Sequence, residues 1–497
     1  MPKNKFYITT SIIYANAEPH IGHALEFLQA DVLARYYRLK YGNENVFFQT
    51  GTDEYGKKNK EAAEAKGKTP QEFMDEISGV FKDLTKRFKI SNNSFIRTTD
   101  KDLHHPVVVD FWKKLSEKGD IFKDTYEALY CTGCEAFLTE KDLEDGKCAV
   151  HQKAPEKVLE ENYFFRLSKY KDKVKELIEK GEIKILPEKR KKEILNLFSG
   201  DVSDVSFSRP KESVGWGIDV PGDDSQKIYV WADALTNYIS GLGGPGSENY
   251  KKFWPADVHL IGKDILRFHA MIWPAMLLAL ELPLPKNIYA HGFITHDGVK
   301  MSKSLGNVVS PFDLIEKYGL DAIRYYLLRE IPSDDDGNFS DARFCERYGD
   351  LSNKLGNLVL RVTAIAEKNK DILGDIKISE SDATKTIKEV ISEYEKSIEN
   401  FHLNTALENV FLLVDVSDKR VEETKLWELA KKDEGEFKKV IEEFVLNIAH
   451  IAYLLLPFLP ETSEKIFASL GISEDKTKWK EQVLDIKKPE QLFPRLD

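Results

Sequence analysis

The sequence is poor in several features that would each indicate a particular class of protein. Only four cysteines occur among 497 residues, which excludes a disulfide-rich secreted scaffold. The longest apolar run, Ala270 to Leu280, is shorter than the roughly 18–20 residues of a membrane span and is interrupted by Pro274. The first residues contain no apolar stretch typical of a targeting signal. We therefore expect a cytoplasmic protein with no membrane partner.

Basic residues are not in excess either. Asp and Glu outnumber Lys and Arg by 83 to 72, and the formal net charge is −11, which argues against a protein that coats nucleic acid indiscriminately. An RNA partner stays compatible with this charge, because phosphate contacts need only a local basic surface. The run Lys189–Lys192 is one candidate surface, and a solvated helix face is the alternative interpretation. At about 150 residues per domain, the length favours roughly three or four domains.

Three of the four cysteines are clustered with a histidine. Cys131 and Cys134 form one half, Cys148 and His151 form the other, and thirteen residues separate the halves. In a reducing compartment this spacing predicts a metal knuckle, and three thiolates with one imidazole suit a structural Zn²⁺ site that has no open position. A chance cluster of reduced thiols is the alternative. Cys345, alone in an expected helix, is interpreted as a small core residue.

The first hundred residues show the pattern of a parallel sheet. Phe6–Thr10 is expected to form a buried strand, a helix is expected from about Gly22 to Tyr41, and Val46–Thr50 is expected to form a second strand. Strand, helix and strand make a βαβ unit, whose binding sites lie at the carboxyl ends of its strands. Both His20 and Asp53 fall at those ends.

The remainder of the chain is expected to change character twice. The insert that carries the cysteine cluster is expected from about 116 to 218, and the sheet is expected to resume at Lys227–Trp231. Further strands are expected at Val258–Ile261 and Asn287–Ala290. From about 350 onward, long amphipathic segments such as Phe437–Leu456 predict a separate helical domain.

Two short signatures lie 280 residues apart, at His20-Ile21-Gly22-His23 and at Lys300-Met301-Ser302-Lys303-Ser304. The histidines lie where the chain enters a helix, so both can face one phosphate together with the N–H groups of the helix start. The two lysines on the later loop can neutralise a departing pyrophosphate. Alone, the histidine pattern also occurs in small nucleotidylyltransferases, and the lysines alone would be interpreted as a surface loop.

In this order the two signatures resemble the ATP-binding signatures of the class I aminoacyl-tRNA synthetases. More specifically, the chain resembles the methionyl-tRNA synthetase family over almost its whole length. The matching stretches are Tyr14–Ala24, Gly51–Gly56, Tyr229–Leu235, Ile261–Ile265, Arg267–His269 and His291–Phe293. The knuckle resembles the single-zinc version of the family's insert.

The resemblance implies an α/β fold: a class I Rossmann-like parallel sheet with a zinc-bearing insert, followed by an all-helical anticodon-binding domain. The first half of the catalytic domain is implied at 1–115, the insert with the knuckle at 116–218, and the second half of the catalytic domain at 219–305. The region of the lysine loop exit and the tRNA stem contact is implied at 306–350, and the helical anticodon-binding domain at 351–497.

The activity implied is ATP-dependent ligation of L-methionine to tRNA(Met) through methionyl-adenylate. Its catalytic groups would be His20, His23, Lys300 and Lys303. The ATP site, which binds the nucleotide with Mg²⁺, would add Gly262, Asp264 and His291 to these four. No general base is needed, because the amino acid's carboxylate is already ionised and can attack the α-phosphate directly.

The methionine pocket implied by the resemblance falls on Ile12, Tyr14, Asp53, Trp231, Tyr238, Ile265 and His269. Asp53 would pair with the substrate ammonium, while Trp231 and Tyr14 would enclose its unbranched side chain. Tyr238 and His269 would offer O–H and N–H donors to the thioether sulfur, a weak acceptor that leucine and isoleucine lack. Such a polar contact is useful, because apolar packing separates substrates that differ by a methylene by only about 1–3 kcal/mol.

In the helical domain the resemblance points to three residues that read the anticodon. Asn357 and Arg361 lie four apart, so they share a helix face and would hydrogen-bond a cytosine edge. Trp427 would stack on a base. Stacking with edge contacts is the usual way in which single-stranded RNA loops are read.

The chain departs from the family at a few positions. The family often has Pro at Ser11, Tyr at Ile13 and an aromatic residue at Ala232; these positions touch the strand entry and the lining of the pocket. The chain stops at Leu492–Arg495, where the family's core usually ends, without the appended dimerising, RNA-binding module of some members. We therefore expect a monomer, or a chain assisted by a separate tRNA-binding subunit in trans.

Three alternatives remain at the level of the sequence. A class I synthetase for another small apolar amino acid is disfavoured, because an insert of about 100 residues is too short for a large editing domain. A simple nucleotidylyltransferase would need neither the helical domain nor the lysine loop. A non-catalytic RNA-binding paralogue is disfavoured by the intact His20, His23, Lys300 and Lys303.

Overall fold

The computed structural model describes residues 4–134, 136–138, 143–149, 152–200, 202–301 and 306–496. His151 and Lys303 therefore lie outside the described residues, as do Ser302 and Ser304 of the lysine signature. The chain divides into two compact units, Met1–His291 and Gly292–Asp497. The finer domain boundaries expected from the sequence stay predictions.

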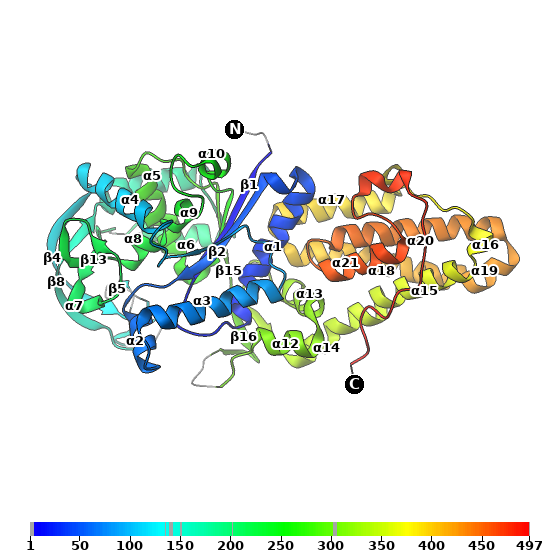
Figure 1. Cartoon of the computed structure of the whole chain (residues 1–497), viewed down its shortest axis with the longest axis horizontal. Helices are drawn as coiled ribbons and strands as arrows, with labels where there is room; N and C mark the ends of the chain where they lie inside the picture. The colour runs from blue at the N-terminus through cyan, green and yellow to red at the C-terminus, as the bar shows by residue number, and fades with distance from the viewer. Residues whose placement is uncertain are drawn as a thin grey trace. The chain divides into compact units, whose positions relative to one another are not determined.

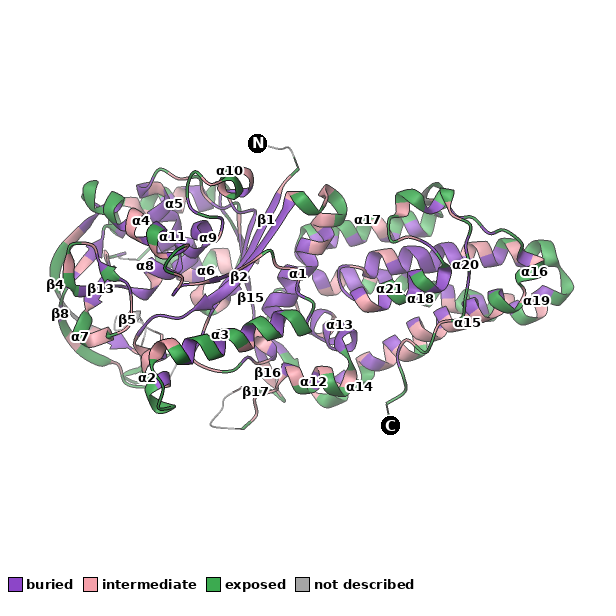
Figure 2. Ribbon diagram, viewed as in Figure 1, coloured by how far each residue is buried: buried purple, intermediate pink, exposed green. Residues whose placement is uncertain are grey.

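The first unit is built on a six-stranded sheet in which every neighbouring pair is parallel. Its strand order is β3 (Ser94–Arg97), β2 (Val46–Asp53), β1 (Phe6–Tyr14), β14 (Val258–Gly262), β15 (Asn287–His291) and β9 (Lys184–Leu186). Strands β1 and β2 run side by side and are buried almost throughout (Figures 1 and 2). The strands of a parallel sheet have continuous apolar sequences, because helices cover both faces of the sheet.

The strand order reverses between β1 and β14. From β1 the chain goes outward to β2 and then β3, whereas β14 and β15 extend from the other side of β1. Such a reversal leaves a crevice at the carboxyl ends of the two diverging strands, which is where open α/β sheets bind ligands. Tyr14 ends β1 and Gly262 ends β14, so the fold puts a site beside these residues.

Helices connect the first three strands of the sheet. They are α1 (Ile21–Tyr41), α2 (Lys57–Ala65) and α3 (Pro70–Arg87). Helix α3 begins with a capping box between Thr69 and Glu72 and has one buried face, whereas α1 is buried over most of its circumference (Figure 2). The strands expected at 6–10 and 46–50 and the helix expected from 22 to 41 are confirmed.

The insert is antiparallel. After α4 (His105–Glu117) comes a four-stranded sheet in the order β10 (Val205–Ser206), β8 (Glu156–Phe165), β4 (Ile121–Cys131) and β5 (Ala136–Leu138). The short hairpin of β6 (Leu143–Glu144) and β7 (Lys147–Cys148) carries the third cysteine. Helices α5 (Leu167–Glu179) and α6 (Glu188–Phe198) flank β9, so part of the expected insert returns to the parallel sheet.

The prediction that the parallel sheet resumes at Lys227–Trp231 is wrong. Strand β13 (Asp223–Ile228) belongs to a separate three-stranded sheet with β11 (Ser208–Pro210) and β12 (Asp219–Val220), next to α7 (Lys211–Val214). Helix α8 (Val230–Ala234) then begins at Val230. A short apolar run fits a buried helix as well as a strand, and periodicity alone does not separate them.

The remaining elements of the first unit surround the end of β14. Helices α9 (Asn237–Ser240) and α10 (Glu248–Phe253) precede that strand, and a 3₁₀ turn (Lys263–Ile265), a π turn (Phe268–Ile272) and α11 (Trp273–Ala279) follow it. The strands expected at 258–261 and 287–290 are confirmed as β14 and β15.

The second unit starts with a three-stranded sheet and continues as helices. The sheet contains β17 (Val299–Lys300), β16 (Ile294–His296) and β18 (Gly337–Phe339). The helices are α12 (Pro311–Tyr318), α13 (Leu320–Glu330), α14 (Asp341–Gly349), α15 (Asn357–Lys368), α16 (Lys370–Leu373), α17 (Lys385–Glu399), α18 (Leu403–Thr424), α19 (Leu426–Lys432), α20 (Glu434–Leu455) and α21 (Pro460–Leu470). Helices α17, α18 and α20 run alongside one another (Figure 1), which confirms the helical region expected from the sequence.

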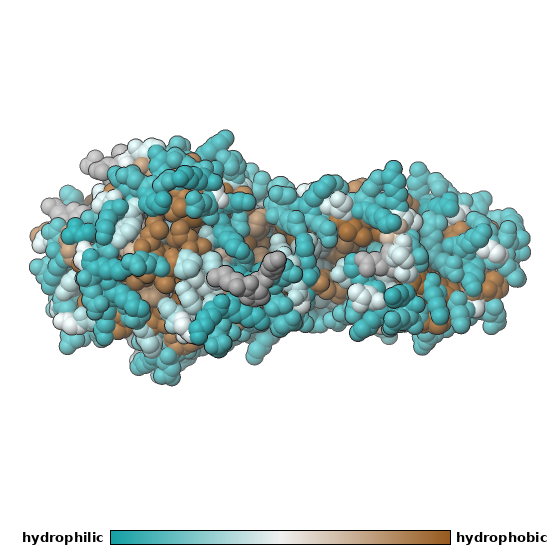
Figure 3. Space-filling model, turned by 90° about the horizontal axis from the view of Figure 1, so that it is seen from above, coloured by the Kyte–Doolittle hydropathy of each residue, from teal (hydrophilic) through white to brown (hydrophobic). Residues whose placement is uncertain are grey.

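Cys345 corrects another expectation. It lies in α14, as expected of a helical residue, but its side chain is exposed rather than part of the core. In the described part of the chain, no helix is both long and apolar enough to cross a membrane. The face seen in Figure 3 is mostly hydrophilic, with apolar side chains gathered in separate patches.

Candidate functional site

The start of α1 is organised by the two histidines of the first signature. His20 is the N-cap residue, and its Nδ1 accepts a hydrogen bond from the backbone N–H of Gly22 at 3.0 Å. In return the backbone N–H of His20 donates to Nδ1 of His23 at 3.2 Å. The two rings stack with their centroids 3.8 Å apart. This is a capping box made of imidazoles in place of hydroxyl and carboxylate groups.

The cap also determines where the protons of both histidines lie. Burial, the neighbouring His20 and His291 together hold the pKa of His23 well below its ordinary value, so this ring is neutral near pH 7. A neutral imidazole that accepts at Nδ1 carries its proton at Nε2. Because backbone N–H groups donate to both Nδ1 atoms, each histidine carries its proton at Nε2, at a helix start where the helix dipole also favours an anion.

Glu26, one turn further along α1, connects this site to two strands. Its Oε1 accepts from the N–H and the hydroxyl of Ser11, at 2.8 and 2.5 Å. Its Oε2 accepts from Nε2 of His291 at 3.1 Å, and both side chains are buried. A proline at position 11 could make neither bond to Glu26. Sequence reasoning missed Glu26; its signal is a single carboxylate within the apolar run from Ala24 to Leu28.

The ends of the central strands bring further expected residues together by register. Tyr14 and Asp53 are partners at the ends of β1 and β2, and Gly262 and His291 are partners at the ends of β14 and β15. Asp53 is buried, whereas Asp264, two residues beyond β14, is exposed. Asn59 of α2 donates to the backbone carbonyl of Asp53 at 3.1 Å, which holds the strand end in place.

Four residues of the expected methionine pocket form one cluster beyond the sheet. Trp231 of α8 is edge-on to the ring of His269, with centroids 6.2 Å apart. The hydroxyl of Tyr238 in α9 lies 2.7 Å from Nε2 of His269, and Nδ1 of His269 lies 3.0 Å from the carbonyl of Ile265. Ile12, on β1, is half-buried and is the register partner of Gly51 on β2.

The donors of this cluster are engaged within the protein. The carbonyl of Ile265 can only accept, so the proton of His269 lies on Nδ1, and Nε2 accepts from the hydroxyl of Tyr238. Burial lowers the pKa of His269 to about 4 and raises that of Tyr238 far above its ordinary value. Both groups are neutral near pH 7, and the N–H and O–H expected to face a thioether sulfur bond to protein atoms instead.

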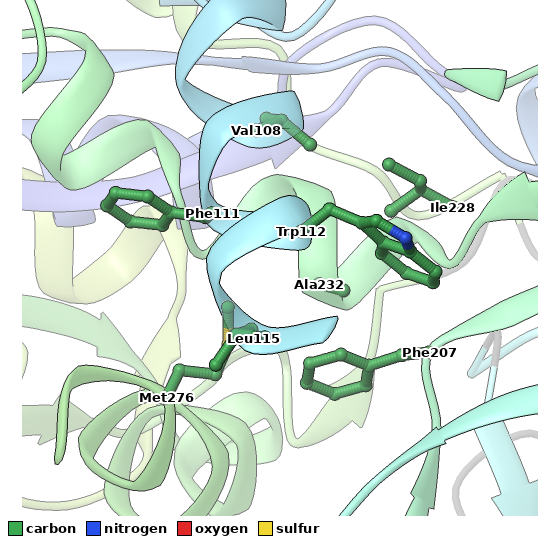
Figure 4. Close-up of a pocket in the computed structure, with 8 residues that line it drawn as sticks. All are labelled: Val108, Phe111, Trp112, Leu115, Phe207, Ile228, Ala232 and Met276. Carbon is green, nitrogen blue, oxygen red and sulfur yellow. The ribbon is translucent and has the colours of Figure 1, made fainter. Parts of the chain in front are cut away.

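An apolar cavity lies next to Ala232 of α8, and neither Tyr238 nor His269 lines it. It measures about 10 Å³ and is lined by residues of α4, α8 and α11 together with Phe207 and Ile228 (Figure 4). Its volume is comparable to that of a single water molecule, so it cannot hold an amino acid. The cavity marks the place where Trp112 and Val108 of α4 pack beside Ala232 of α8 (Figure 4).

The three clustered cysteines fit a metal ion. The sulfur atoms of Cys131, Cys134 and Cys148 all lie within 4.8 Å of one another, and the last two are 3.5 Å apart. Thiolates around a tetrahedral Zn²⁺ at about 2.3 Å would be separated by roughly 3.8 Å, whereas a disulfide needs about 2.05 Å. Burial and the neighbouring thiols raise the pKa of Cys134. The expected fourth ligand, His151, lies outside the described residues.

The knuckle is linked to α2 by side chains. The amino group of Lys58 donates to the carbonyl of Gly133 at 3.3 Å and lies 5.3 Å from the centre of the Tyr14 ring. Lys57 pairs with Glu156, which also accepts from the hydroxyl of Thr132. These contacts position the turn between the first two cysteines.

The other expected residues lie in the second unit. Lys300 is exposed at the end of β17. Asn357 and Arg361 lie on α15, and Arg361 pairs with Glu422 at 2.6 Å and with Asp418 at 3.6 Å on α18. Trp427 of α19 is 46% exposed, and α18 packs against both α15 and α19. The three expected anticodon residues therefore belong to one group of helices.

Known proteins resemble this chain over most of its length. The family model described as class I tRNA synthetases (M) matches residues 6–144 and 138–363. Methionine–tRNA ligases of Caldanaerobacter subterraneus and Bacillus subtilis are each 43% identical to the chain, over 100% and 99% of its length and 79% and 78% of theirs.

The chain belongs to the methionyl-tRNA synthetase family of class I.

Two further members of the methionyl-tRNA synthetase family match nearly end to end. The Rickettsia felis methionine–tRNA ligase is 40% identical, over 100% of this chain and 99% of its own. The structure of Mycobacterium tuberculosis methionyl-tRNA synthetase in complex with methionyl-adenylate has a TM-score of 0.91 at 36% identity, covering 99% of this chain and all of that one. The class I fold, with its Rossmann-like parallel sheet and helical C-terminal region, is thus confirmed.

Proposed function

We propose that this protein is a methionine–tRNA ligase that forms methionyl-adenylate from L-methionine and ATP and transfers the methionyl group to tRNA(Met). The observation that carries this proposal is the imidazole cap at the start of α1, in which both histidines accept at Nδ1 and carry their protons at Nε2, beside the switch point of the parallel sheet. Family membership supports the choice of methionine. We propose that this reaction takes place in the cytoplasm.

The first half-reaction needs charge stabilisation more than proton transfer. The methionine carboxylate attacks the α-phosphorus of ATP, the bond to the bridging oxygen breaks, and pyrophosphate leaves. Negative charge builds on the α-phosphate oxygens, and the Nε2–H groups of His20 and His23 are the proposed donors to it. Since Nδ1 of each ring accepts a hydrogen bond from the backbone, the two rings act as hydrogen-bond donors through Nε2. Lys300 and Lys303, with the Mg²⁺ that accompanies ATP, are the proposed partners of the pyrophosphate.

The remaining residues of the site hold the two substrates in position. Asp53, buried at the end of β2, is the proposed partner of the methionine ammonium. Gly262, Asp264 and His291 are proposed to bind the nucleotide, and Glu26 fixes the ring of His291 through its 3.1 Å hydrogen bond. Aligning the reacting atoms in this way supplies a large part of the rate.

The methionine side chain is proposed to lie among Ile12, Tyr14, Trp231, Tyr238, Ile265 and His269. His269 donates a hydrogen bond to the carbonyl of Ile265 and accepts one from the hydroxyl of Tyr238. The substrate sulfur would therefore lie beside a neutral histidine whose two ring nitrogens are both hydrogen-bonded within the protein. We propose that selectivity rests mainly on the shape of this apolar pocket. The hydroxyl oxygen of Tyr238 keeps a lone pair but offers no further proton.

The second half-reaction requires recognition of the tRNA. A hydroxyl of the terminal ribose attacks the carbonyl carbon of the adenylate, and AMP leaves. Asn357, Arg361 and Trp427 are proposed to read the anticodon by edge contacts and stacking. Cys131, Cys134, Cys148 and His151 are proposed to hold a structural Zn²⁺, which would supply only rigidity to the insert. We propose that the chain acts as a monomer or with a separate tRNA-binding subunit.

Anticodon reading can be tested apart from adenylate formation. We predict that Arg361→Ala lowers the charging efficiency for a CAU-anticodon tRNA by about 10- to 100-fold, the range expected for loss of a bidentate base contact, with methionine-dependent ATP–pyrophosphate exchange unchanged. Arg420→Ala is the matched control, because Arg420 pairs with Glu443 on the same unit and has no proposed RNA role. Equal losses in the two variants would remove Arg361 from the recognition surface.

A further inference from the structure

A buried histidine outside the expected site joins two of its helices. His104 precedes α4, and its Nε2 lies 2.6 Å from Oδ1 of Asp233, while its Nδ1 lies 2.7 Å from the hydroxyl of Ser240. The exposed fractions of His104, Asp233 and Ser240 are 0%, 1% and 0%. The carboxylate of Asp233 accepts, so His104 donates from Nε2, and the hydroxyl of Ser240 lies between Nδ1 of His104 and the carbonyl of Asn237, to which it donates at 3.4 Å.

The three residues resemble a hydrolytic triad in composition, but their burial excludes that role. A nucleophilic serine must reach a substrate, and the hydroxyl of Ser240 lies in the interior, hydrogen-bonded to His104 and to the carbonyl of Asn237. The arrangement is therefore a connection between elements. His104 is also the N-cap residue of α4, yet its side chain makes no capping bond there, so the imidazole is directed entirely to its neighbours.

The two elements that His104 joins both carry pocket residues. Asp233 lies two residues after Trp231 on α8, and Ser240 lies two residues after Tyr238 on α9. Trp231 and Tyr238 both contact the ring of His269, one edge-on at 6.2 Å and the other by a 2.7 Å hydrogen bond. Trp231 also stacks on Phe268 with ring centroids 3.8 Å apart, so α8, α9 and the turn at Phe268 together determine the surroundings of His269.

Neither helix can hold its own position. Helix α8 has five residues and α9 has four, and helices shorter than about 12 residues are unstable without tertiary contacts. Helix α9 is fixed to the sheet, because Gln49 donates to the side chain and carbonyl of Asn237, at 2.8 and 3.0 Å, and the hydroxyl of Tyr7 donates to the carbonyl of Tyr238 at 2.7 Å. Helix α8 is joined to this frame by the amide of Asn237, which donates to the carbonyl of Ala234 at 2.6 Å, and by the bond from His104 to Asp233.

Apolar side chains of α4 also pack beside α8. Residues Val108, Phe111 and Trp112 of α4 line the small cavity next to Ala232 (Figure 4). The apolar side chains that line this cavity lack packing partners on one side. Helix α8 therefore has room to shift when the hydrogen bond between His104 and Asp233 is removed.

We propose that His104 is a positioning residue of the amino-acid pocket: it holds α8 against α9 and thereby fixes Trp231 relative to Tyr238 and His269. The proposal rests on the proposed function, in that the pocket binds the methionine side chain. It concerns the amino-acid site alone. The ATP groups on α1, β14 and β15 are held by other contacts, such as those of Glu26.

The test separates the two substrates in steady-state ATP–pyrophosphate exchange. His104→Ala is expected to raise the KM for methionine about tenfold, a typical cost of a misplaced binding group, with little change in the KM for ATP. His104→Gln keeps an N–H donor towards Asp233 and is expected to restore part of the methionine affinity. Ser240→Ala cuts the other bond with minimal change in volume and should shift the KM for methionine in the same direction.

Controls separate positioning from a general loss of stability. His450, which is 1% exposed on α20 in the second unit, is changed to Gln in parallel; it is expected to alter thermal stability but neither KM. An unchanged methionine KM in folded His104→Ala and Ser240→Ala would overturn the proposal, as would equal rises in both KM values. If His104→Ala does not fold, the glutamine and serine variants decide. Failure of the unmodified protein to activate methionine would instead refute the proposed function.

Discussion

At the scale of single residues, the backbone directs the protons of the site. The N–H groups of His20 and Gly22 occupy one nitrogen of each signature histidine, so the other nitrogen becomes a donor. The glycine between the histidines has a steric reason: a Cβ at Gly22 would lie 2.8 Å from Cε1 and 2.9 Å from Nδ1 of His20. The spacing of the two histidines is thus required by helix capping as well as by the proposed phosphate binding.

We predict that Gly22→Ala displaces the ring of His20 and lowers the kcat/KM of ATP–pyrophosphate exchange by about 10- to 100-fold, since donors misplaced by about 1 Å lose most of their effect. Loss of the cap should also cost about 1 kcal/mol of unfolding free energy. The control is Gly435→Ala, at the same position relative to its cap in α20, where the nearest atom to a new Cβ is Oδ1 of Asp433 at 3.5 Å. Equal activity in both variants would contradict the steric account.

Burial of neutral histidines also makes stability depend on pH. The pKa of His269 falls from 6.5 to about 4 on folding, mainly through burial. Below pH 6.5 the unfolded chain therefore takes up a proton that the folded chain does not, and stability falls as pH decreases towards 4. We predict that His269→Gln flattens this dependence by about 1 kcal/mol per pH unit between pH 6 and 4.5. Denaturant unfolding at both pH values measures it, and parallel curves for variant and parent would be inconsistent with a neutral buried ring.

At the scale of elements, long periodic segments could be predicted and short ones could not. Strand β1, helix α1 and helix α20 follow from apolar patterning over many residues. The segment 227–231 is predicted as a strand, but it contains the end of β13 and the start of α8, because a short apolar run fits a buried helix as well as a strand. The ties through Glu26 and His104 join residues 15 and 129 positions apart, a distance at which periodicity carries no information.

The knuckle is an element whose stability depends on its ligands. We predict that Cys148→Ala abolishes stoichiometric zinc binding and makes the β4–β8 hairpin sensitive to proteolysis, because the metal's binding energy contributes to folding of the insert. Methionine-dependent exchange should be largely retained. Cys345→Ala is the matched control, since that thiol is exposed and lies outside the cluster. Unchanged zinc content in Cys148→Ala, or complete loss of exchange with the fold intact, would contradict a structural knuckle.

At the scale of the whole molecule, the sequence motifs were sufficient for the family and the fold, because signatures spread over 497 residues are unlikely to coincide by chance. The pocket chemistry was less predictable: the donors expected to face the substrate sulfur bond to each other and to Ile265. Such pairing depends on rotamers and burial, which no single-sequence pattern contains. We expect a monomer, so light scattering should give a mass near 57.0 kDa; a stable homodimer would refute this.

The central claim is that this chain activates methionine through the capped histidines. The most direct measurement is ATP–pyrophosphate exchange with the purified protein in the presence of methionine, leucine, isoleucine, valine, cysteine or homocysteine in turn. The account predicts the highest kcat/KM with methionine and loss of exchange in His23→Ala. Stronger exchange with another amino acid, or exchange that persists in His23→Ala, would contradict it.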